Sequence, residues 1–271
     1  VTASWDEDSV RTANLVFGAR VPVNDTAGLT LEYGDGVASS VEPTNALTVE
    51  ETDTHVIVRQ GPVTYTVNRD GYNVVDTATF DRDRWGGKHP LGDIPSGLKT
   101  FLAPGSPPPT LVLSDSPSLH PNNVTVITET RGPCAGRLRI EGSYGSAITF
   151  TQYLTFYKSV SWFKVDTELS GDTENVEAMR IESSLDLSSG PISSASGARQ
   201  RSDSRPISWV VVTDDESTVD VAAMDAWTPS NDIRFVVDPG PRLTAVLPVA
   251  DTIPSLWYHF LVTPPADHFH T

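Results

Sequence analysis

The chain has 271 residues, of which 19 are Lys or Arg and 35 are Asp or Glu, so its formal net charge is −16. A nucleic-acid-binding protein needs a cationic surface to displace counterions, and a chain this acidic is a poor candidate for that class. No run approaches the roughly 18 consecutive apolar residues of a membrane span. We therefore expect neither nucleic acid nor a membrane as a partner.

Strand patterns recur along the whole chain. Alternating β-branched and aromatic residues predict strands, in chain order, at residues 54–59, 63–67, 123–130 and 148–157. Turn sequences rich in Gly, Asp and Pro separate such runs, and no apolar stripe with helical spacing exceeds about three turns. The sequence therefore predicts an all-β fold, a large antiparallel β-sandwich with few and short helices.

The strand pattern is interrupted in several places. Residues 37–43 have the composition of a linker, so we expect a small β piece of a preceding domain at residues 1–40 and the β-sandwich at residues 41–271. Residues 81–109, residues 187–206 and the tail from residue 264 are expected to be long irregular loops. Loops on a β-sandwich commonly carry binding and catalytic groups.

Three sequence patterns resemble those of one known family. They are WDEDSVR (5–11) followed by TANLVF, then LTVEE (47–51) with GPVTYTVNRDGY (61–72), and finally ETRGPCAGRLRIEG (129–142) with LTFY (154–157) and WFKVDTEL (162–169). Their order and spacing resemble the exo-rhamnogalacturonan lyase family, polysaccharide lyase family 26. The first pattern departs from the family at Glu7, Asp8 and Thr12.

The resemblance implies an N-terminal RIFT-type barrel, a central β-sandwich and a C-terminal (α/α) toroid. Residues 1–40 would be the end of the barrel, and residues 41–271 would be the sandwich. It also implies a secreted protein that cleaves an acidic plant-type polysaccharide by β-elimination. The matching patterns are mostly strand and turn signatures, so candidate site residues have to come from the chemistry of the side chains.

β-Elimination beside a uronate needs a cation for the carboxylate, a base for the C5 proton and an acid for the departing oxygen. The densest suitable cluster lies within residues 81–90. There we assign sugar binding to Arg82, Arg84, Trp85 and Lys88, and proton transfer to His89. The alternative is a solvated loop whose Asp and Arg side chains pair with each other.

Two strand segments supply further candidates. At residues 257–260, alternation places Trp257 and His259 on one face and Tyr258 on the other, and either Tyr258 or His259 is a candidate acid or base. The alternative is an aromatic core strand. Arg180 and Glu182 also share a face, where they would line a sugar cleft or form an exposed ion pair.

The remaining candidates favour structural roles. His268 and His270 supply only two ligands of a metal site, so no metal centre is predicted. Cys134 lacks a His partner and is interpreted as a small buried hydrophobe. No cofactor is expected, although a divalent cation such as calcium stays open.

Three hypotheses follow. The first is a secreted lyase whose partner is a polysaccharide or oligosaccharide. The second is a non-catalytic carbohydrate-binding or interdomain module of a larger enzyme. The third is a structural surface or filament subunit, and the state of assembly stays open in all three.

Overall fold

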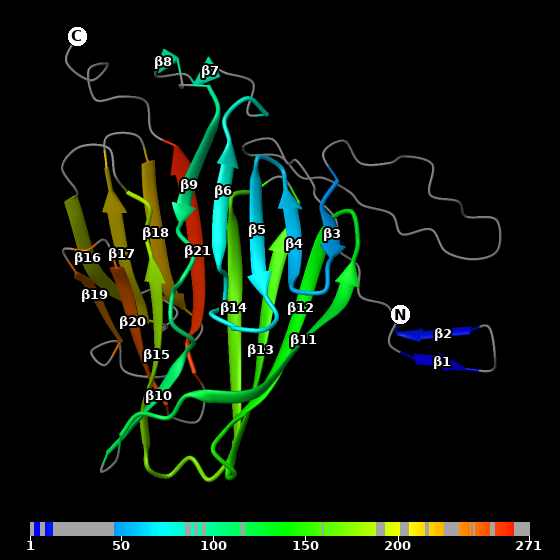
Figure 1. Cartoon of the computed structure of the whole chain (residues 1–271), viewed down its shortest axis with the longest axis vertical. Coiled ribbons are helices and arrows are strands. Elements are labelled where there is room, and N and C mark those ends of the chain that lie inside the picture. The colour runs from blue at the N-terminus through cyan, green and yellow to red at the C-terminus, as the bar shows by residue number, and fades with distance from the viewer. Residues whose placement is uncertain are drawn as a thin grey trace.

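The computed structural model describes residues 3–5, 9–12, 46–84, 88–89, 92–93, 96–114, 117–158, 160–187, 193–200, 206–214, 217–224, 233–238, 240, 242–249 and 253–262. All regular secondary structure within these ranges is β-strand, and all strand pairings are antiparallel. Two layers of sheet pack face to face (Figure 1). The predicted all-β sandwich is therefore confirmed.

The first layer is a single sheet of eight strands. Across the sheet they are β11 (Pro121–Arg131), β12 (Ala135–Tyr144), β13 (Ile148–Tyr157), β14 (Trp162–Gly171), β21 (Ser255–Val262), β18 (Ser217–Met224), β17 (Pro206–Thr213) and β16 (Ser193–Gln200). The four strands β11–β14 form a meander, as do the three strands β16–β18. β21 pairs with β14 on one side and with β18 on the other, so it joins the two meanders.

The second layer consists of a five-stranded and a four-stranded sheet. The first is formed by β3 (Thr48–Glu51), β4 (His55–Gln60), β5 (Val63–Asn68), β6 (Thr77–Asp81) and β9 (Leu98–Leu102), and the second by β10 (Thr110–Leu113), β15 (Val176–Ser184), β20 (Arg242–Pro248) and β19 (Arg234–Asp238). A bridge between Leu102 and Leu185 joins them, and the amide of Ala103 donates to the carbonyl of Ser184 at 2.9 Å. The second layer is thus continuous from β3 to β19.

Two small hairpins complete the described strands. β1 (Ala3–Trp5) pairs with β2 (Ser9–Thr12), and β7 (Lys88–His89) pairs with β8 (Gly92–Asp93). The predicted linker at residues 37–43 lies outside the described residues.

An aromatic cluster fills the space between the two layers. Tyr65 from β5 contacts Phe156, Phe163 and Phe260 of the eight-stranded sheet, with ring centroids 5.1, 5.2 and 6.0 Å away. Phe101 from β9 contacts Phe260 at 5.1 Å. All five side chains are fully buried, because every second residue of each strand points inward.

Buried polar groups also connect the layers. The Tyr72 hydroxyl donates to the Gln152 side-chain oxygen at 2.7 Å, and the Gln152 amide donates to Thr167 at 2.9 Å. The ammonium group of Lys99 in β9 lies 3.3 Å from the carboxylate of Asp214, which follows β17. These groups have partners inside the protein, which offsets much of the cost of removing them from water.

Two of the segments predicted to be irregular contain strands. β9 lies within residues 81–109 and pairs with β6, and β16 lies within residues 187–206 and pairs with β17. Both segments are rich in residues with low intrinsic strand propensity. The prediction was wrong there because pairing with a neighbouring strand outweighs local propensity.

Candidate functional site

Aromatic rings in mutual contact lie on the outer face of the eight-stranded sheet. Phe163 and Tyr258 point into the core, so their chain neighbours Trp162 and Trp257 point outward. The ring centroids of Trp162 and Trp257 are 4.7 Å apart, and those of Tyr157 and Trp162 are 5.0 Å apart. All three outward rings are half-buried, so part of each remains open to solvent.

A fourth ring extends this surface. Trp257 is opposite Ala222, and Ala222 is opposite Trp209 on the next strand. Neighbouring strands lie about 4.8 Å apart, so the two tryptophan backbones are separated by about 10 Å. Ala222 is the residue between them in this row across the sheet. We call Tyr157, Trp162, Trp257 and Trp209 the aromatic face.

A histidine and a carboxylate adjoin the aromatic face. His259 is opposite Trp162 on one neighbouring strand and opposite Asp220 on the other. Partial burial lowers the pKa of His259, and the charge of Asp220 opposes this change. Partial burial likewise raises the pKa of Asp220, against the effect of His259. A neutral imidazole beside a carboxylate supplies both a donor and an acceptor for ligand hydroxyl groups.

We expect Asp220→Asn to lower the pKa of His259 further, because it removes the charge that favours the imidazolium form while burial remains. The measurement is an NMR titration of the imidazole C–H resonances. Glu182→Gln, which removes a carboxylate from the other layer, should leave the titration unchanged. A wild-type pKa above the ordinary value for His, or an increase in Asp220→Asn, would contradict this arrangement.

Cationic groups stand over two rings of the same sheet face. The Lys164 ammonium lies 5.4 Å from the Trp257 ring centroid and 2.9 Å from the Asp166 carboxylate. The Arg137 guanidinium lies 3.9 Å above the ring of Tyr153. Hydrogen-bond donors and acceptors thus lie beside aromatic rings on this face of the sheet.

Tyr258 was predicted as a catalytic candidate, and it lies in the core. Its ring stacks on Phe163 at 4.9 Å and its hydroxyl lies 3.2 Å from that of Ser183. Burial raises the pKa of Tyr258 to about 12. A hydroxyl that is buried between the layers has no access to a ligand on either outer face. The structure therefore favours the core alternative for Tyr258. Of the two acid or base candidates on this strand, His259 is the one that faces outward.

The two arginines of the 81–90 cluster differ in their surroundings, since Arg82 is buried and Arg84 forms an ion pair at the surface. Arg82 is buried, with 6% of its surface exposed, and its amide donates to the carbonyl of Gly97. Arg84 is exposed and pairs with Asp81 at 3.2 Å, as the solvated-loop alternative expects. Trp85 and the side chains of Lys88 and His89 lie outside the described residues. The sugar subsite at residues 81–90 therefore stays a prediction.

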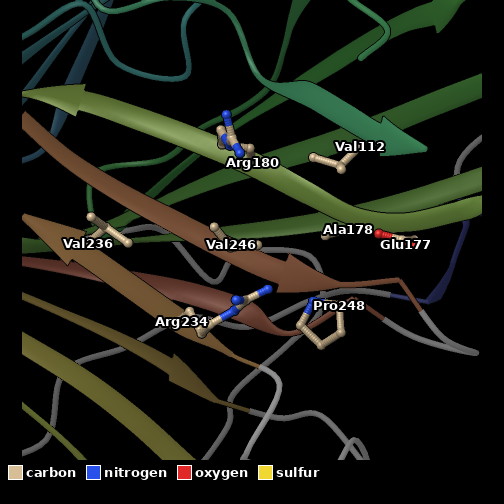
Figure 2. A pocket seen from close by; sticks show the side chains of 8 residues that line it. All are labelled: Val112, Glu177, Ala178, Arg180, Arg234, Val236, Val246 and Pro248. Atoms are coloured by element: carbon tan, nitrogen blue, oxygen red, sulfur yellow. The ribbon is translucent and has the colours of Figure 1, made fainter. Parts of the chain in front are cut away.

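Arg180 and Glu182 share the outer face of the four-stranded sheet, as predicted. Glu182 faces Arg242 at 3.5 Å. Arg180 lines a cavity of about 740 Å³ together with Arg234 of β19 (Figure 2). This cavity belongs to the other layer of the sandwich, so the structure does not bring Arg180 and His259 into one site.

Several residues of these surfaces were not predicted from the sequence. Trp162 stands within a recognised pattern, and a Trp beside an inward-facing Phe on a strand was a usable signal for an outward ring. Trp209 and Asp220 gave no signal, because only the pairing of β17, β18 and β21 places them beside Trp257 and His259. Arg234 likewise depends on the pairing of β19 with β20.

Three further expectations concern the burial of Cys134, metal-ligating groups and membrane-spanning segments. Cys134 was expected to be buried and is only half-buried. Within the described ranges, no group of three or more His, Cys, Asp or Glu side chains is placed to hold a metal ion. In the same part of the chain, no helix is long and apolar enough to span a membrane. His268 and His270 lie outside it.

Comparisons with known proteins give low similarity. No family model and no curated protein matches the chain. Among solved structures, it is similar to the GH36 alpha-galactosidase AgaA from Geobacillus stearothermophilus, with 11% identity, a TM-score of 0.38, and coverage of 78% of this chain and 41% of that chain. It is also similar to the galactosidase domain of the alpha-galactosidase-sucrose kinase AgaSK, with 8% identity, a TM-score of 0.41, and coverage of 81% and 42%.

The chain therefore spans less than half the length of these solved structures. At these identities and TM-scores the similarity carries no argument about fold or activity. The structures are glycoside hydrolases, and AgaA variants were also solved in complex with stachyose and with raffinose. They do not support the resemblance to polysaccharide lyase family 26.

Proposed function

We propose that this protein binds an oligosaccharide or polysaccharide on the aromatic face. The observation that carries the proposal is the contact between Tyr157, Trp162 and Trp257 on an outer sheet face. One face of a pyranose ring presents C–H groups, which pack on an aromatic ring, and its edge presents hydroxyl groups. His259, Asp220 and Lys164 adjoin the rings, where they can accept from or donate to those hydroxyl groups.

A half-buried aromatic surface is also typical of a contact between protein modules, because aromatic residues dominate both kinds of interface. The two occupants differ in what they require. A sugar needs the flat rings themselves, whereas a protein surface also uses the neighbouring aliphatic side chains. Leu261, which is 41% exposed and follows His259 on the outer face of β21, distinguishes the two.

The test is binding of soluble polysaccharides, first by affinity electrophoresis against a panel of neutral and acidic polymers and then by calorimetry with the polymer that retards the protein. We expect Trp162→Ala and Trp257→Ala each to weaken binding about thirty-fold, because truncating a central aromatic contact costs about 2 kcal/mol. Leu261→Ala should bind within about two-fold of the wild type, since it leaves every ring in place.

Three outcomes would count against the proposal. They are no retardation by any polymer, retardation that survives both Trp substitutions, and equal loss in Leu261→Ala. Thermal unfolding of each variant separates lost binding from lost structure.

We further propose that the full-length protein cleaves the bound polysaccharide by β-elimination. His259, with a lowered pKa, is the described residue best suited to accept a proton at neutral pH. Incubation with rhamnogalacturonan and detection of unsaturated product by ultraviolet absorbance tests it. Product that disappears in His259→Gln would support the lyase hypothesis, and no product from the full-length protein would remove it. A secreted location is part of this proposal, since polysaccharide substrates of this kind lie outside cells.

A further inference from the structure

We propose a second ligand site, in the cavity on the outer face of the four-stranded sheet, for a small organic monoanion that carries one carboxylate on an apolar body. The cavity has a volume of about 740 Å³. Its walls come from all four strands of that sheet, β10, β15, β20 and β19 (Figure 2). It lies on the opposite layer from the aromatic face, so it is independent of the proposed carbohydrate site.

Two arginines flank the same position of this sheet. Val246 of β20 is opposite Arg180 on β15 and opposite Arg234 on β19, so the three residues form one row across the sheet. Figure 2 shows Val246 between the two arginines. Backbones two strands apart are separated by about 10 Å. Two extended arginine side chains, one from each strand, are long enough to reach a ligand between them. Both side chains are exposed and both line the cavity.

Neither arginine has an acidic partner among the described residues. Arg59, Arg69, Arg84, Arg131, Arg137, Arg139 and Arg242 each pair with a carboxylate in this acidic protein. Two unpaired guanidinium groups in one row repel each other until an anion lies between them. A planar guanidinium binds a carboxylate through two parallel hydrogen bonds, so the pair is suited to one oxyanion.

The rest of the cavity is mainly apolar. Next to the arginine row, Ala178 of β15 pairs with Val112 of β10 and with Pro248 of β20, which gives a row of small apolar side chains. On the other side of the arginines lies Val236, which is 47% exposed. Apolar walls around one charged group select a ligand with an apolar body and a single charged end.

A carboxylate limits the charge of the ligand. Glu177 is exposed, lines the cavity next to Ala178 and has no ion pair in the described part of the chain. The strand is irregular at this point, since the pairing of β10 with β15 shifts register between Val112 and Leu113. A second anionic group beyond the apolar row would meet this carboxylate. The site should therefore reject dianions and favour a monoanion, which separates it from a surface for acidic polymers.

The probe for the test is 3-phenylpropionate, titrated into the full chain by calorimetry and by NMR. We expect weak saturable binding, about ten-fold weaker in Arg180→Gln and in Arg234→Gln, because each substitution removes a charge-assisted hydrogen bond. Arg242→Gln is the matched control. It removes an exposed arginine of the same sheet that pairs with Glu182 and does not line the cavity, and it should bind like the wild type.

The chemical class is tested with analogues. We expect 3-phenylpropanamide, which lacks the charge, acetate, which lacks the apolar body, and 1,4-phenylenediacetate, which carries a second carboxylate, to bind more weakly than the probe. Glu177→Gln should improve binding of the dianion. No binding of the probe, wild-type affinity for the probe in both arginine variants, or affinity for the amide or for inorganic phosphate equal to that for the probe would overturn the proposal. Trp162→Ala should not change binding of the probe, so this result is separable from the outcome for the carbohydrate site.

Discussion

Replacing Phe163 with alanine should lower the free energy of unfolding by about 3–5 kcal/mol, a cost typical of removing a large buried aromatic side chain. Phe163 is fully buried, and its ring contacts Tyr65, Phe156, Tyr258 and Phe260. These rings come from both layers of the sandwich. To fill the space left by the Phe163 ring, both sheets would therefore have to move. The cavity that remains adds to the lost transfer free energy.

Urea denaturation followed by tryptophan fluorescence measures this loss. Leu261→Ala is the control, because Leu261 lies on the outer face of β21 and is 41% exposed. It should change the free energy of unfolding by less than about 1 kcal/mol. A loss below about 1 kcal/mol for Phe163→Ala would show that the ring cluster is not the packed centre of the sandwich.

Replacing Asp214 with alanine should cost about 3–5 kcal/mol as well, for an electrostatic reason. The Asp214 side chain is fully buried and that of Lys99 is 9% exposed, so water does not replace the lost partner of the ammonium group. The same carboxylate accepts from the amide and the hydroxyl of Ser217, at 2.7 and 2.8 Å. The substitution therefore leaves a charge and two polar groups without this acceptor.

A double-mutant cycle tests the assignment. Lys99→Met with Asp214→Ala should be more stable than Asp214→Ala alone, since it removes the buried charge that lost its partner. The exposed pair between Arg59 and Glu50 provides the comparison, and Glu50→Gln should cost less than about 1 kcal/mol. If Asp214→Ala costs no more than Glu50→Gln, or if the double variant is less stable than the single one, the buried pair does not hold the layers together as described.

Local alternation made part of the fold predictable. Residues 63–67 lie in β5 and alternate between inward apolar and outward polar side chains, and residues 54–59 overlap β4, in which Val56, Val58 and Gln60 are the buried residues. The same rule placed Trp257 and His259 on one face and Tyr258 on the other. Each of these patterns reflects the period of two residues within a single strand, which a sequence carries directly.

The neighbours of those residues were not predictable in the same way. The contact of Trp162 with Trp257 depends on the pairing of β14 with β21, and the row of Arg180 and Arg234 depends on two pairings with β20. Strand order and register are set by how whole faces are buried, and no short segment contains that information. Candidate residues could therefore be named from the sequence, whereas the grouping of residues into sites could not.

The place of β21 in the eight-stranded sheet has a consequence for biosynthesis. β21 is the last strand in chain order that the structure describes, yet it lies between β14 and β18 and is their only connection within that sheet. While the chain emerges from the ribosome, the meanders β11–β14 and β16–β18 each expose an unpaired edge until residues 255–262 are available. Exposed edges of this kind pair readily with other chains, so nascent molecules are most prone to aggregate during this interval and chaperone capture should be strongest there.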